Sequence, residues 1–89
     1  LTALIRTAIR DERYSVSLHA ENRLEQRGIE LWQVIAALEE AEVVSVRPAS
    51  TPNPSVIFRA LLPDGTEACA VWAWQDSTSS AILVTVYFK

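Results

Sequence analysis

Hydrophobic periodicity divides this 89-residue chain into two halves of different character. Up to Ala41, apolar residues recur every three or four positions, which is the spacing of one helix face. Beyond it, the chain contains short runs of β-branched and aromatic residues separated by turn sequences, which is typical of strands. Helices followed by consecutive hairpin strands predict a single α+β domain, with N-terminal helices packed on one face of a four-stranded, mainly antiparallel sheet.

Three helical segments and four strands are expected. The first helix covers residues 1–12, the second stops near Gly28, and the third carries Leu31 to Leu38 on its apolar face. Residues 14–17 are expected to be extended or loop-like. The expected strands cover residues 43–46, 56–62, 67–74 and 81–88. Asp64-Gly65 is a hairpin signal between the second and third of them.

Alternation of side chains in the last strand predicts which residues are buried. The residues assigned to the core face are Ile82, Val84, Val86 and Phe88. Leu83, Thr85 and Tyr87 are then expected on the other face. Whether Arg59 of the second strand joins that face depends on the strand register, which the sequence does not determine. Trp72, Trp74 and Cys69 are interpreted as core residues, with a base-stacking platform as the alternative for the two tryptophans.

The second helical segment contains the only histidine of the chain, followed by two arginines at four-residue intervals. At this spacing His19, Arg23 and Arg27 follow one face of a helix. Like charges so placed destabilise an isolated helix by roughly 0.2–0.5 kcal/mol per pair, so the pattern favours an anion site, with phosphate the obvious ligand. A structural alternative stays open, because a cation suits the last helical turn before Gly28 and Arg23 could pair with a carboxylate elsewhere.

Composition narrows the possible functions. One cysteine excludes an internal disulfide framework, and one histidine without an acidic cluster makes a metal site unexpected. No apolar run reaches the ~20 residues that span a bilayer, and no signal-peptide pattern is found, so no membrane association is expected. The single cysteine favours a cytoplasmic protein, and no cofactor is expected. A net charge of −3 and a pI of about 5.0 count against generic nucleic-acid binding but permit a small cationic site. The chain begins at Leu1, so we expect a shortened chain or the last domain of a longer protein.

Several of these residues together resemble a known group of proteins. His19-Ala20-x-x-Arg23, then Arg27-Gly28-Ile29 and a closing Val84-Thr85-Val86-Tyr87 resemble the HAxxR…RGI…TVY pattern of small bacterial RelE-like toxin domains. Those belong to the barnase/EndoU/colicin/RelE-like group of RNases, and the resemblance spans roughly residues 14–89.

The resemblance implies a metal-independent endoribonuclease of the toxin type, with an RNA substrate and a protein antitoxin or immunity partner. In such chemistry the ribose 2′-hydroxyl attacks the adjacent phosphate, so the site needs a base, a proton donor and cations. The implied catalytic residues are His19, Arg23, Thr85 and Tyr87. The implied phosphate- or RNA-binding residues are Arg23, Arg27 and Arg59. The resemblance alone also implies that His19 and Arg23 lie close to Thr85 and Tyr87 in space.

The chain departs from that pattern in two respects. Many members carry a second histidine in the strand after the hairpin, where this chain has Cys69. RelE-like nucleases are also usually basic, whereas this chain is acidic. Two alternatives therefore stay open: a non-catalytic RNA- or protein-binding module on the same scaffold, and a protein-interaction domain whose His/Arg stripe is structural.

Overall fold

The computed structural model describes residues 1–88 and contains three helices and a five-stranded sheet. The helices are α1 (Thr2–Arg10), α2 (Leu18–Arg27) and α3 (Leu31–Ala37), the last continued by a 3-10 turn, η1 (Leu38–Glu40). The strands are β1 (Tyr14–Val16), β2 (Glu42–Arg47), β3 (Ser55–Leu61), β4 (Glu67–Gln75) and β5 (Ser80–Phe88), with a second 3-10 turn, η2 (Asp76–Thr78), before β5. The α+β class and the order of helices before hairpin strands are confirmed.

The expectation of four strands was wrong, because Tyr14–Val16 adds a fifth. The strand order is β1-β5-β4-β3-β2, and β1 runs parallel to β5 while the other neighbours are antiparallel. Only three residues of β1 pair with β5, too few to show a strand period in the sequence. The mixed sheet therefore has β1 at one edge and β2 at the other.

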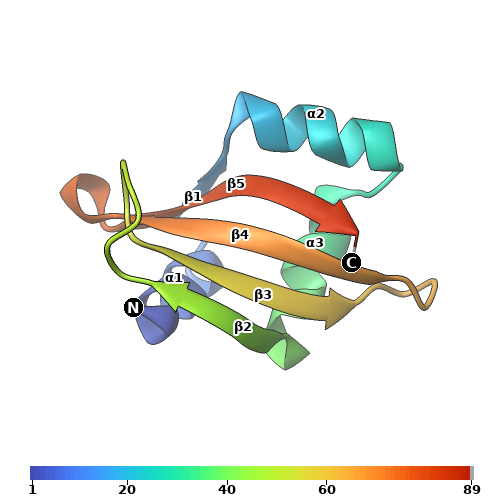
Figure 1. The fold of residues 1–89 in the computed structure, drawn as a ribbon, viewed down its shortest axis with the longest axis horizontal. Helices are drawn as coiled ribbons and strands as arrows, with labels where there is room; N and C mark the ends of the chain where they lie inside the picture. The colour runs from blue at the N-terminus through green and yellow to red at the C-terminus, as the bar shows by residue number, and fades with distance from the viewer. Residues whose placement is uncertain (89) are drawn as a thin grey trace.

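The helices occupy two positions around this sheet. Figure 1 shows α1 and α3 on one side of the sheet and α2 beyond β5, alongside its C-terminal half. The core lies between the sheet and the helices, and its largest fully buried side chains are Trp72, Phe58, Ile5, Leu83, Val56 and Val86. Trp74 is also buried, which confirms the core interpretation of the two strand tryptophans, whereas Trp32 is 62% exposed.

The hairpin between β3 and β4 confirms the turn predicted at Asp64-Gly65. The Leu62 N–H donates to the Thr66 carbonyl over 2.8 Å, and Gly65 has a φ of 89° that suits glycine. The Thr66 N–H also donates to Asp64 Oδ1 over 2.9 Å, and this bond lowers the pKa of Asp64. Within residues 1–88, no helix is long and apolar enough to cross a membrane.

A bulge in β5 corrects the predicted side-chain alternation. Val71 pairs with Thr85 and Trp72 with Leu83, so Val84 is an extra residue between the two pairs. Leu83 and Val86 are consequently both fully buried, while Val84 is 37% exposed. The core assignment is confirmed for Val86 and wrong for Val84, and Leu83 occupies the core in its place. Ile82 and Phe88 likewise lie outside the fully buried set.

We call the face of the sheet that α1 and α3 do not cover the open face. The pairing of Arg59 with Cys69 and of Cys69 with Tyr87 forms one row across β3, β4 and β5. Thr85 and Val71 form the next pair on this face. Residues paired across neighbouring strands share a face, so the register answers the question left open for Arg59: it lies on the same face as Thr85 and Tyr87.

Candidate functional site

Ser17 fixes the start of α2 against β5. Its backbone N–H donates to the Leu83 carbonyl over 3.0 Å, which continues the pairing of β1 with β5 by one residue. Its hydroxyl donates to the carbonyl of Val84, the bulge residue, over 3.0 Å. The same oxygen accepts the Ala20 N–H over 3.0 Å and so caps α2. One serine thus joins the helix start to the bulge.

His19 follows this junction directly and contacts the next residue of β5. Its Nε2 and the hydroxyl oxygen of Thr85 are 3.1 Å apart, within hydrogen-bond distance, although 66 residues separate them in sequence. His19 is exposed and Thr85 is half-buried, so a ligand has access to the imidazole. The contact expected between His19 and the last strand is present at Thr85.

Tyr87 lies two residues beyond Thr85 on the open face, at a spacing along the strand of roughly 6.6–6.8 Å. Its side chain is 37% exposed. Partial burial raises the pKa of Tyr87, and the neighbouring thiol of Cys69 raises it further, while Arg47 acts in the opposite direction. The phenol therefore stays protonated at neutral pH and can donate a hydrogen bond.

Cys69 occupies the middle of the row that contains Tyr87. The thiol is buried, with 3% of the residue exposed, which confirms its interpretation as a buried side chain. It lies between Tyr87 on β5 and Arg59 on β3. The position where the resemblance expects a histidine thus faces the same surface as Thr85 and Tyr87.

Arg59 lies at the other end of this row. Two strand spacings place it about 10 Å from Tyr87 across the sheet. One of its guanidinium nitrogens contacts Glu42 Oε2 at 2.6 Å, and this hydrogen bond raises the pKa of Arg59. Arg59 therefore shares the open face with the site but has a carboxylate partner already.

The two arginines of α2 differ in their surroundings. Both are half-buried. Arg23 has no hydrogen bond or ion pair to any of residues 1–88, so the carboxylate partner allowed by the structural alternative is not found there. The guanidinium of Arg27 lies 5.0 Å from the centre of the Phe88 ring. Phe88 pairs with Ala68 of the helix-side core, so Arg27 lies on the side of β5 opposite Thr85 and Tyr87.

Sequence reasoning missed a cavity of about 310 Å³ on the open face. It lies between the strands and the loop of residues 48–54, and Arg47 contributes to its wall. Figure 1 shows this loop rising from the end of β2 towards β5. Its sequence is rich in turn residues, and no periodic signal indicates that it lines a cavity on the sheet.

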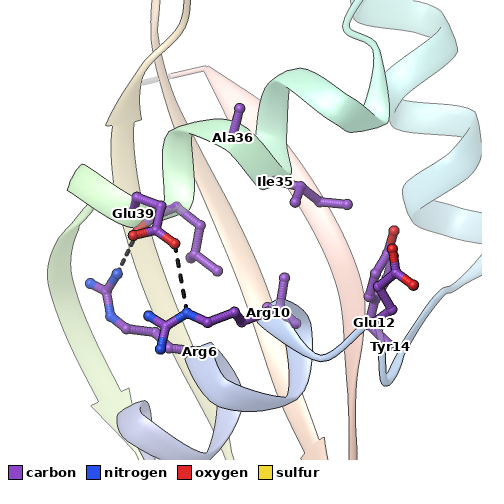
Figure 2. A pocket seen from close by; sticks show the side chains of 9 residues that line it. Arg6, Arg10, Glu12, Tyr14, Ile35, Ala36 and Glu39 are labelled. Atoms are coloured by element: carbon purple, nitrogen blue, oxygen red, sulfur yellow. Dashed lines mark hydrogen bonds and ion pairs between the residues drawn. The ribbon is translucent and has the colours of Figure 1, made fainter.

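A larger cavity of about 570 Å³ lies between α1 and α3, and its lining includes none of His19, Thr85 and Tyr87. Figure 2 shows Arg10 directed towards Glu39, to which it forms a 3.8 Å ion pair, with Glu12 and Tyr14 at the opposite wall. Arg6 donates to the carbonyls of Leu38 and Ala41, which fastens α1 to the end of α3. The polar groups here serve helix packing.

The groups that the structure brings together are the imidazole of His19 and the hydroxyl of Thr85, with the hydroxyl of Tyr87 two residues further along β5. Among residues 1–88, no group of three His, Cys, Asp or Glu side chains is close enough together to hold a metal ion. An imidazole next to a hydroxyl, with a second hydroxyl beyond it, can transfer protons and bind an anion.

The fold and this site define a small α+β domain with a histidine-bearing helix docked along one strand. The chain matches a family model described as a domain of unknown function (DUF4258) over residues 16–88, and it belongs to that family. The match begins at Val16, the last residue of β1, and includes every residue of the site. No curated protein and no solved structure matches the chain.

Proposed function

We propose that this protein is a metal-independent endoribonuclease of the toxin type. The observation that carries the proposal is the 3.1 Å contact between His19 Nε2 and Thr85 Oγ1, with Tyr87 on the same face of β5. RNA cleavage without a metal requires a base, a donor to the leaving oxygen and positive charge near the phosphate. These three functions are available from His19, Tyr87 and Arg23.

In the proposed reaction, the imidazole of His19 accepts the proton of the ribose 2′-hydroxyl, whose oxygen attacks the adjacent phosphorus. The bond between phosphorus and the 5′-oxygen breaks, and Tyr87 donates a proton to that oxygen. The products are a 2′,3′-cyclic phosphate and a 5′-hydroxyl. Thr85 orients the imidazole and can donate to a phosphate oxygen, because a hydroxyl both accepts and donates.

Arg23 is the proposed phosphate ligand. A planar guanidinium binds two phosphate oxygens at once, and Arg23 has no partner among residues 1–88 that would have to be displaced. Arg27 is better explained by its packing against Phe88, which favours the structural alternative for that residue. Arg59 would have to leave Glu42 to bind RNA and is a secondary contact at most.

The acidic charge of the whole chain limits the strength of RNA binding. Net charge −3 repels a polyanion at long range, so affinity has to come from the few cations of the site. We expect weak binding that falls steeply with salt. A cytoplasmic toxin that binds a dedicated antitoxin or immunity protein is the biological setting that the RelE-like resemblance supports.

The second candidate is a non-catalytic RNA- or protein-binding module on the same scaffold. Cys69 favours it, because it replaces the expected second histidine in the row beside Tyr87. Without that histidine, a single imidazole and a phenol have to share the proton transfers. The two candidates agree on the binding surface and differ only in cleavage.

A cleavage assay on single-stranded RNA, with ribosome-bound message as a second substrate, tests the proposal. Wild-type protein in EDTA is expected to produce ends with a 2′,3′-cyclic phosphate, and a 2′-deoxy residue at the cleaved position is expected to block the reaction. Asn22→Ala, an exposed change on the same helix, is the matched control for His19→Ala. No cleavage of either substrate by wild type would contradict the proposal and leave the binding module.

A further inference from the structure

The open-face cavity adjoins the proposed catalytic centre. Its floor, meaning the part lined by the strands β4 and β5, includes Val71, Ile82 and Val84, and the loop of residues 48–54 lines it with Thr51 and Asn53 among others. Val84 precedes Thr85 directly, and Val71 is paired with Thr85 across β4 and β5. The bulge that brings Thr85 to the open face therefore also supplies a wall of the cavity.

The charge of Arg47 acts on both the open-face cavity and the proposed catalytic centre. Arg47 lines the cavity, and its charge acts on the hydroxyl of Tyr87. A ligand in the cavity therefore lies beside a positive charge that also acts on Tyr87. A positive charge here suits a ligand that carries a phosphate.

The lining matches a flat, uncharged ring with polar edges. Three aliphatic side chains offer a surface for the face of a ring, whereas residues 48–54 carry no charged side chain. Asn53 is half-buried, and its amide has no hydrogen-bond partner among residues 1–88. An unused amide can donate to and accept from the edge of a nucleobase. The volume of about 310 Å³ is at the small end of ligand sites, too small for a folded partner element.

We infer that this cavity binds one unpaired nucleobase of the RNA, next to the phosphate held at His19 and Thr85. The inference rests on the proposed function and adds a specificity determinant to it. The substrate class becomes single-stranded RNA, because a base has to leave its helix to enter the cavity. The loop of residues 48–54 then selects which base is accepted, through Asn53 and Thr51.

Two variants alter the cavity without touching the proposed proton-transfer groups. Ile82→Phe fills the floor with an aromatic ring at a half-buried position, two residues from the bulge. Asn53→Ala removes the amide and leaves the floor intact. Leu61→Ala, at an exposed site of β3 outside the cavity, is the matched control. Amide NMR spectra establish that each variant is folded before binding is measured.

Binding is measured with the four ribonucleoside 3′-monophosphates and with inorganic phosphate alone, by NMR titration at low salt. One or two of the nucleotides are expected to shift the resonances of Val71, Ile82, Val84 and Asn53, whereas phosphate alone leaves them unmoved. Ile82→Phe is expected to weaken that binding at least tenfold and Asn53→Ala about fivefold, while Leu61→Ala binds as wild type. Shifts from no nucleotide, or equal binding by wild type and Ile82→Phe, would overturn the inference.

RNA cleavage patterns separate this inference from the proposed function. Cleavage next to a preferred base by wild type, with that preference lost in Ile82→Phe, supports both. Cleavage at identical positions by both proteins overturns the base site and leaves the nuclease standing. Specific nucleotide binding without any RNA cleavage keeps the base site and rejects the nuclease in favour of the binding module.

Discussion

The hydroxyl of Ser17 donates a hydrogen bond to the backbone carbonyl of Val84 over 3.0 Å, and it caps α2 at the same time. This single group ties the start of the histidine-bearing helix to the bulge in β5. His19 is two residues further along the helix, and Thr85 is one residue further along the strand. The geometry of the candidate site therefore depends on Ser17.

Ser17→Ala should destabilise the protein by about 1–2 kcal/mol, because it removes a helix cap together with a hydrogen bond to the bulge. Denaturant unfolding measures this loss. Ser15→Ala, at the one exposed position of β1, is the control and should change the free energy of unfolding by less than about 0.5 kcal/mol. Equal stability of the two variants would show that the Ser17 hydroxyl is not a structural link.

The bulge also predicts that two valines of β5, Val84 and Val86, differ in their contribution to stability. Val86→Ala should cost about 2 kcal/mol of unfolding free energy because the side chain is fully buried in the core. Val84→Ala should cost about 0.5 kcal/mol, since that side chain is 37% exposed. Denaturant unfolding of both variants checks the difference. Similar costs of about 2 kcal/mol for both variants would contradict the bulge and fit the uninterrupted alternation that the sequence predicts.

The two arginines of α2 should separate stability from activity. Arg27→Ala should lower the unfolding free energy by about 0.5–1 kcal/mol through loss of its contact with Phe88, with RNA cleavage unchanged. Arg23→Ala should leave stability nearly unchanged and impair cleavage. Arg23→Lys should cleave faster than Arg23→Ala but more slowly than wild type, because an ammonium cannot bind two phosphate oxygens in the way a planar guanidinium does. Both unfolding and cleavage rates are measured for each variant. Impaired cleavage by Arg27→Ala at wild-type stability would return Arg27 to the phosphate site.

The pKa of Tyr87 gives a prediction for high pH. Burial and Cys69 raise it above the ordinary tyrosine value of about 10, so the folded protein favours the protonated phenol. The contribution to stability is therefore complete below the unfolded-state pKa and is lost as the pH rises through the folded-state pKa. Ultraviolet titration of wild type against Tyr87→Phe should reveal a phenol that ionises above pH 10. A midpoint below pH 10 would contradict the environment described for Tyr87.

The sequence predicts much of this fold, for reasons that are local. Helix periods, the turn at Asp64-Gly65 and the stop at Gly28 depend on neighbours a few residues away. The strand β1, by contrast, forms only by pairing with β5 far along the chain, as in the pair of Val16 with Leu83. The bulge at Val84 is stabilised in the same way by Ser17, so neither feature has a local signal.

The site, too, could be predicted from the sequence only where it depends on local features. The sequence shows the stripe of His19, Arg23 and Arg27 as a pattern, but its three members have different surroundings because α2 lies alongside the C-terminal half of β5 rather than over the sheet. Placing Arg59 on the open face required the register of β3 against β4. The cavity beneath residues 48–54 required the path of a loop, which composition alone does not determine.

Cleavage of single-stranded RNA by His19→Ala, compared with wild type and Asn22→Ala in the presence of EDTA, tests the central claim most directly. If His19 transfers a proton, the rate should fall by about 10²–10⁴-fold in His19→Ala and stay unchanged in Asn22→Ala. Wild-type products should end in a 2′,3′-cyclic phosphate. Cleavage by His19→Ala at the wild-type rate, or no cleavage by wild type, would contradict the account.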